Sequence, residues 1–105
     1  MTQKEIQIAK ILKGKLVQIS PLLDFRVFGS RARGNAQEDS DLDIFIEVSL
    51  LNENLDEQIQ HIAWEVGLEH MIFISVVAFS QFDLEHTPLR SSPLVRNIME
   101  EGICL

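Results

Sequence analysis

Apolar residues recur along this chain at two spacings, and the changes between them define the expected elements. Residues 4–19 and 54–67 carry an apolar side chain every three or four positions, which predicts two amphipathic helices. Pro21 follows the first of these and ends it, because the residue before a proline disfavours helical backbone. A last helix is predicted to begin at Pro93, a first-turn position that suits proline, and to stop at Gly102.

Shorter apolar runs predict three strands, over residues 24–28, 42–48 and 71–79. The third is apolar on both faces, which is typical of a strand in the centre of a sheet. A short helical turn is predicted over residues 30–34 and a polar loop over residues 35–40. The fold class expected is therefore α/β (α+β), a small mixed sheet with helices packed on it.

The length of 105 residues predicts a single domain, 1–105, with one core of two packed layers. No apolar run reaches the ~20 residues of a membrane span, and the first residues form a polar helix pattern, so no membrane association is expected. Cys104 is the single cysteine and excludes an internal disulfide. A reducing cytoplasmic location is the natural expectation.

The net charge of −7 is unevenly distributed. Residues 1–33 carry seven Lys or Arg against two acids, whereas residues 34–105 carry two against fourteen. An acidic chain repels nucleic acid, so direct DNA or RNA binding is disfavoured. A single triphosphate could still be drawn to the basic segment that contains Arg31 and Arg33.

The stretch FGSRARGNAQEDSDLDIFIEV, residues 28–48, holds the candidate chemistry. Asp41 and Asp43 stand at alternate positions at the start of a strand, so they project from one face with Cα atoms roughly 6.5–7 Å apart. Two like charges this close destabilise each other unless a cation lies between them. Hard carboxylate oxygens suit Mg²⁺ together with substrate phosphates, and two such ions can hold both oxygens of a phosphoryl or nucleotidyl transfer.

Gly29 and Ser30 follow the first strand and open a helical turn. Glycine lets the backbone approach a ligand closely, and free N–H groups at a helix start attract phosphate. Each feature also has an ordinary structural explanation. A Gly-Ser pair is commonly a turn, an Asp-x-Asp pair is commonly a solvated strand start or a helix cap, and the two arginines can be surface residues. The conjunction of strand, Gly-Ser, ten residues, Asp-x-Asp and strand favours a nucleotide site.

This conjunction resembles a known family. Gly29-Ser30, ten residues, then Asp41-Leu42-Asp43 is similar to the signature of nucleotidyltransferases related to DNA polymerase beta. The fuller string GSRARG…DSDLD resembles the minimal nucleotidyltransferases found in gene pairs with HEPN proteins, over essentially the whole chain.

The resemblance implies a polymerase beta-like core and a transfer of AMP from ATP that depends on Mg²⁺. Members that act as antitoxins in type VII toxin–antitoxin systems adenylylate a tyrosine of the partner HEPN ribonuclease. On this chain, Asp41 and Asp43 would hold the metals as catalytic residues, Gly29 and Ser30 would contact ATP, and Arg31 and Arg33 are candidate phosphate ligands.

One departure leaves a second function open. The wider superfamily has a third carboxylate on a later strand, whereas the run MIFISVVAF has none and carries Ser75 about there. Glu47 shares a face with Asp43 but lies further along its strand, and Glu69 and Asp83 lie just outside the third predicted strand. The chain could therefore be a weak enzyme, or an antitoxin that neutralises its HEPN partner by binding alone.

Transfer to a small molecule such as an aminoglycoside is a weaker alternative, since it ordinarily needs an additional domain. The high apolar content, 46%, also predicts a hetero-oligomer or homo-oligomer.

Overall fold

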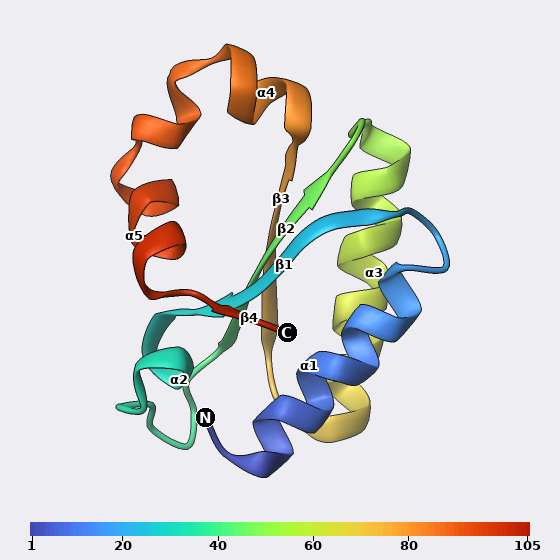
Figure 1. Ribbon diagram of the computed structural model, residues 1–105. Helices are drawn as coiled ribbons and strands as arrows, with labels where there is room; N and C mark the ends of the chain where they lie inside the picture. The colour runs from blue at the N-terminus through green and yellow to red at the C-terminus, as the bar shows by residue number, and fades with distance from the viewer.

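The computed structural model describes residues 1–105, and its centre is a four-stranded mixed sheet with helices on both faces (Figure 1). The elements follow the chain in the order α1 (Gln3–Leu16), β1 (Leu22–Phe28), α2 (Gly29–Arg33), β2 (Leu42–Val48), α3 (Glu53–His70), β3 (Ile74–Ser80), α4 (Gln81–His86), the 3₁₀ helix η1 (Pro88–Ser91), α5 (Pro93–Glu101) and β4 (Ile103–Cys104). The mixed α/β class expected from the sequence is confirmed. None of the helices is both long and apolar enough to cross a bilayer.

The strands lie in the order β3-β2-β1-β4. Strand β1 pairs antiparallel with β2 and with β4, whereas β2 pairs parallel with β3. The prediction that the third strand is central is therefore wrong, because β3 lies at an edge of the sheet. It is apolar on both faces because helices cover both, and not because a strand flanks it on each side.

Helices cover the sheet on its two faces, so the domain has three layers where its size had suggested two (Figure 1). On one side, α1 and α3 pack on a cluster that includes Ile44 and Ile46 of β2. On the other side, Phe45 packs with Leu84 of α4 and with Val95 and Ile98 of α5. The alternation predicted for this strand thus holds, and both of its faces are buried. Each such side chain contributes about 1.5–3 kcal/mol when fully buried.

Some boundaries differ from those predicted. Helix α1 ends at Leu16, three residues before the predicted end, and a hydrogen-bonded turn follows it. Helix α3 continues to His70, and Met71 caps it in the left-handed conformation at φ 56°. Strand β3 therefore begins only at Ile74, and Met71 lies outside it. The short elements α4, η1 and β4 were not predicted, because each is six residues or fewer and has no periodic pattern of its own.

Candidate active site

The two ends of the Gly-Ser…Asp-x-Asp motif meet where β1 ends and β2 begins. Phe28, the last residue of β1, lies opposite Asp43 in the antiparallel pairing. Gly29 follows with a φ of +75°, a conformation that disfavours any residue with a side chain. A Cβ placed on Gly29 would overlap Oδ2 of Asp43. The carboxylate therefore packs directly on the bend, and only glycine leaves room for it.

Asp41 and Asp43 form a negative pair without a protein partner. Asp41 is exposed and Asp43 half-buried, and neither carboxylate has a hydrogen bond or an ion pair within the chain. Burial raises the pKa of Asp43, the charge of Asp41 raises it further, and the nearby Arg33 offsets only part of this effect. A bound cation would relieve the repulsion that the protein itself leaves in place.

Helix α2 opens beside this pair. Its N-cap residue, Phe28, offers no side-chain hydrogen bond to the first backbone N–H groups. The hydroxyl of Ser30 has no partner in the protein, although its carbonyl accepts hydrogen bonds from Gly34 and Asn35 at the end of the turn. Donors therefore remain available next to the carboxylates, at the point where a phosphate was expected.

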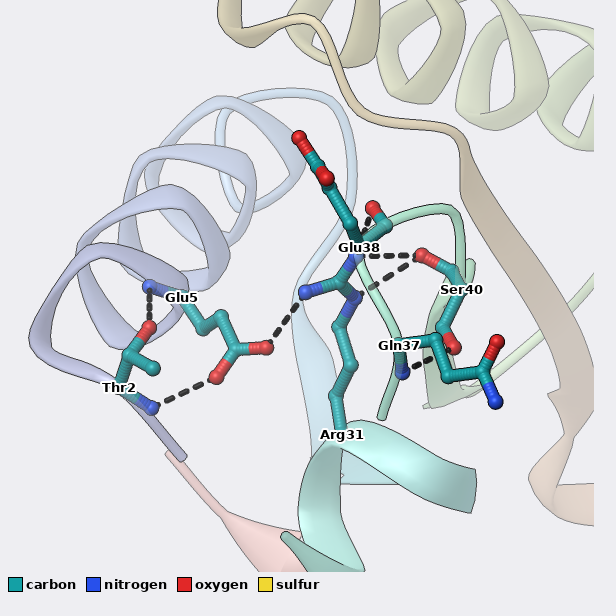
Figure 2. A network of polar contacts seen from close by, with 6 residues as sticks. All are labelled: Thr2, Glu5, Arg31, Gln37, Glu38 and Ser40. Carbon is teal, nitrogen blue, oxygen red and sulfur yellow. Dashed lines mark hydrogen bonds and ion pairs between the residues drawn. The ribbon is translucent and has the colours of Figure 1, made fainter. Parts of the chain in front are cut away.

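Arg31 is engaged elsewhere (Figure 2). Its Nη1 donates to Oε2 of Glu5 at 2.7 Å, and its Nε and Nη2 donate to the carbonyl of Ser40 at 3.0 and 2.6 Å. A further bond from Nη2 reaches the carbonyl of Glu38 at 3.3 Å. The guanidinium thus connects two segments. It binds the loop that precedes Asp41, through Ser40, and the start of α1, through Glu5. We call Glu5, Arg31 and Ser40 the loop brace.

Glu5 is the functional candidate that the sequence did not reveal. It is buried, and the Thr2-x-x-Glu5 capping box that starts α1 holds one of its carboxylate oxygens, 2.6 Å from the backbone N–H of Thr2. Burial alone raises the pKa of Glu5, but hydrogen bonds from Arg31 and Thr2 and the charge of Arg31 outweigh it, so the pKa lies below its usual value. The capping box could have been found from the sequence, whereas the contact with Arg31, 26 positions away, could not.

Arg33 is the more available arginine. It makes one long ion pair, 3.6 Å from Nη1 to Oε2 of Glu101, and both side chains are about half exposed. Its charge acts on Asp43. A phosphate could replace such an exposed pair at little cost, because surface ion pairs contribute about 0–1 kcal/mol.

No third carboxylate joins the pair. The parallel register places Ser75 of β3 opposite Asp43, and Ser75 is exposed. Glu47 lies four residues further along β2, about 13 Å away by strand geometry. Glu69 lies near the end of α3 and Asp83 in α4, beyond the far end of β3. No group of three metal-binding side chains occurs in the chain.

Two carboxylates still suit Mg²⁺, which takes one or two of them together with waters and substrate phosphates. The unpaired oxygens and the raised pKa of Asp43 fit such an ion. Asp41 is exposed and Asp43 is half-buried, so the carboxylate pair can be reached from the surface.

Comparisons with known proteins identify the family and the fold. The family model described as "Nucleotidyltransferase domain" matches residues 8–105. A search of curated proteins found no match. Among solved structures, a protein assigned as a minimal nucleotidyltransferase superimposes with a TM-score of 0.67 at 22% identity, covering 100% of this chain and 97% of the other.

Two toxin–antitoxin crystal structures have the same fold. One, solved with AMP-PNP, gives a TM-score of 0.60 at 19% identity and covers 90% of this chain and 70% of that one. The other, a mutant of the pair MntA–HpeT, gives 0.59 at 19% identity, covering 92% and 70%.

Proposed function

This chain belongs to the nucleotidyltransferase domain family, and from that premise we propose that it is an antitoxin that transfers AMP from ATP to a tyrosine of a cognate HEPN ribonuclease toxin. The fold it shares with an antitoxin complex that contains AMP-PNP supports this proposal. So does the openness of the site, since a folded protein can present a tyrosine to an exposed pair of carboxylates more readily than to a closed pocket.

The observation that carries the proposal is the contact between Asp43 and Gly29. It brings an unpaired carboxylate pair within reach of free donors on α2, which is the arrangement that a nucleoside triphosphate with its metal requires. Asp41 and Asp43 would hold Mg²⁺, as two ions in the full arrangement, while Gly29, Ser30 and Arg33 would contact the phosphates. The bound metal would supply charge neutralisation at the transferring phosphoryl group.

The reaction balances without any further co-reactant. The phenol oxygen of the acceptor tyrosine forms a bond to the α-phosphorus of ATP, the bond from that phosphorus to the bridging oxygen breaks, and pyrophosphate leaves. The phenol proton passes to solvent, because this chain offers no third carboxylate beside Asp43. A phenol, with an unperturbed pKa near ~10, ionises more easily than an aliphatic alcohol and tolerates that lack better.

We assign Arg31 a positioning role in this reaction. Three of its nitrogen atoms already donate to protein oxygens, so it holds the Ser40 carbonyl and with it the backbone that leads into Asp41. Its earlier assignment as a phosphate ligand stays a prediction, and it would require the loop brace to open. Arg33 needs no such rearrangement.

A second candidate function rests on Ser75. Because no acid stands opposite Asp43 on β3, the chain could neutralise its toxin by covering the toxin's active site, without transferring AMP. This antitoxin would keep protecting cells after both aspartates are replaced, whereas the enzyme would not.

The test uses the purified chain, the HEPN protein encoded beside it, Mg²⁺ and ATP labelled at the α-phosphate. We expect label on the toxin and a mass gain of one or more AMP groups, and neither with Asp43→Asn. Asp39→Asn, an exposed acid in the same loop, is the matched control and should label normally. Two results together would show that the chain is an antitoxin that acts by binding and not an enzyme. The Asp41→Asn, Asp43→Asn double variant would still protect cells, and the wild-type chain would add no AMP to the toxin.

A further inference from the structure

Strand β3 directs a row of backbone hydrogen-bonding groups away from the rest of the sheet. The N–H of Leu42 donates to the carbonyl of Phe73 at 2.9 Å. This bond shows which residues of β3 direct their backbone groups toward β2, since successive residues alternate between the two sides of a strand. Ile74, Val76 and Ala78 consequently direct their N–H and C=O groups away from β2, at the edge of the sheet. The protein satisfies one of these groups with a side chain, since Nε2 of Gln60 donates to the carbonyl of Val76 at 3.1 Å.

Apart from the hydrogen bond from Gln60, this edge lacks the sequence features that usually prevent pairing with another strand. Natural edge strands carry charges, prolines or bulges. Here the twelve residues 71–82 contain no charged residue and no proline, and the register of β3 with β2 is unbroken. The helices on both faces account for the apolar faces of β3, but they add no charge, proline or bulge to its outer edge.

Large apolar side chains lie exposed at both ends of β3. Before the strand, Trp64, Leu68, Met71 and Phe73 are 60%, 65%, 94% and 79% exposed, and they line a cavity of about 500 Å³. We call this cavity the edge groove. After the strand, Phe82 on α4 is 60% exposed. Exposed apolar side chains gathered in this way mark interaction surfaces.

We propose that a second copy of this chain pairs antiparallel with β3, so that two sheets join into one across a two-fold axis. The register that uses the whole strand sets Ile74 opposite Ser80 of the second copy, and Val76 opposite Ala78. The outward groups then bond to one another, as in an ordinary antiparallel ladder. Gln60 can remain in place, because a carbonyl oxygen accepts two hydrogen bonds.

The same register explains the exposed residues beyond the strand. Ser80 of the second copy lies opposite Ile74, which lines the edge groove, and α4 with the exposed Phe82 begins directly after Ser80. The two-fold axis repeats this arrangement at the other end, so an exposed ring comes near an edge groove twice. Both parts of the arrangement belong to this one chain, and this favours a second copy over an unrelated protein.

Charge does not oppose self-association along β3. The chain carries a net charge of −7, and most faces would repel a second copy. Residues 71–82 bring no charges together across the new ladder. The dimer needs no catalysis, so it stands or fails independently of AMP transfer.

The test measures the mass of the purified full chain by sedimentation and light scattering across a wide range of concentration. We expect a dimer, with Phe82→Glu and Phe73→Glu each raising its dissociation constant roughly tenfold or more, since a buried aromatic is a typical hot spot. Both side chains are exposed in the monomer, so neither change should impair folding. Ile103→Glu, a matched change at the opposite edge of the sheet, should leave the dimer intact.

Amide hydrogen exchange gives a second readout at the atoms concerned. The amides of Ile74, Val76 and Ala78 should exchange slowly in the dimer and fast in Phe82→Glu. A wild-type chain that stays monomeric at every concentration would overturn the proposal. So would a dimer that survives both phenylalanine substitutions, or one in which these three amides stay unprotected until a different protein is added.

Discussion

The carboxylate of Asp43 rests against the Cα of Gly29, across the junction of two antiparallel strands. The contact fixes the bend and the carboxylate relative to each other before any ligand arrives. Preorganisation of this kind matters in phosphoryl transfer, where catalysis consists mostly of positioning and electrostatic stabilisation. The contact also places a constraint on the sequence that can be tested by substitution.

Gly29→Ala should damage both stability and nucleotide binding. Alanine at a φ of +75° costs about 1–2 kcal/mol, and its methyl group would displace Asp43 in addition. Gly34→Ala is the matched control, because Gly34 has a φ of +80° with no atom within 4 Å of an added Cβ. Urea unfolding and calorimetric titration with AMP-PNP and Mg²⁺ should separate them: both variants lose stability, and Gly29→Ala alone loses binding. Equal binding by the two would remove the role given to this contact.

Asp43→Asn should stabilise the protein while it abolishes transfer. Because the folded-state pKa of Asp43 is raised, the ionised carboxylate disfavours the native state at neutral pH, and the amide removes that effect. The gain should shrink as the pH falls through the folded pKa of Asp43 and be absent below its usual value of 3.8, where wild type is protonated in both states. Transfer should fall at least about a hundredfold, since a metal site contributes several kcal/mol to transition-state stability.

Chemical unfolding at pH 7 and pH 3 checks the stability difference, with Asp39→Asn as the control that should show none. A variant less stable than wild type at pH 7 would mean that the carboxylate has a partner in solution that the structure lacks.

Glu5→Gln should loosen the loop that carries Asp41. Removing one partner of a nearly buried ion pair costs about 3 kcal/mol, and the loop brace has no other acid. The pKa of Glu5 is lowered in the folded state, so its stabilisation is full above 4.5 and is lost as the pH falls through the folded pKa. The difference between variant and wild type should therefore be large at pH 7 and small in acid.

Faster amide exchange in residues 35–41 would distinguish a loosened loop from a general loss of stability. Glu101→Gln removes the exposed partner of Arg33 and should change the free energy of unfolding by less than about 1 kcal/mol. Comparable losses in the two variants would contradict the special role of the brace.

Much of the fold follows from local pattern, and the exceptions have physical causes. The predicted ends of strand β2 match the observed ends. The Asp-x-Asp pair marks the start of the strand, and the alternation of side chains that follows indicates its length and which side chains lie on each face. The position of β3 was missed because helices on both faces give the same apolar composition as a central position. Helix α4 is too short for helical periodicity to appear in its sequence.

The candidate site divides in the same way. Gly29 and Asp43 stand in one motif, so their proximity could be predicted from a strand–bend–strand reading. The loop brace joins Glu5 to Arg31 across 26 positions, and such contacts depend on how the strands and helices pack. Nothing in the sequence distinguishes Arg31, whose guanidinium is held by several hydrogen bonds, from Arg33, which makes one long ion pair.

Ser75→Asp should restore the acid that this chain lacks. The register sets position 75 opposite Asp43, and the side chain there is exposed, so an aspartate would fit without repacking. Without metal, a third carboxylate adds repulsion, and the thermal unfolding midpoint should fall below that of wild type. With Mg²⁺ and AMP-PNP the midpoint should rise above that of wild type, because the ion gains a ligand.

If transfer is limited by removal of the phenol proton, the rate of transfer by Ser75→Asp should rise roughly tenfold or more, within the range of general-base catalysis. Ser49→Asp, an exposed serine beyond the other end of β2, should do neither. A midpoint that falls in Ser75→Asp and stays low with Mg²⁺ would show that position 75 does not reach an ion held by Asp41 and Asp43, and the expected gain in transfer rate would be refuted with it.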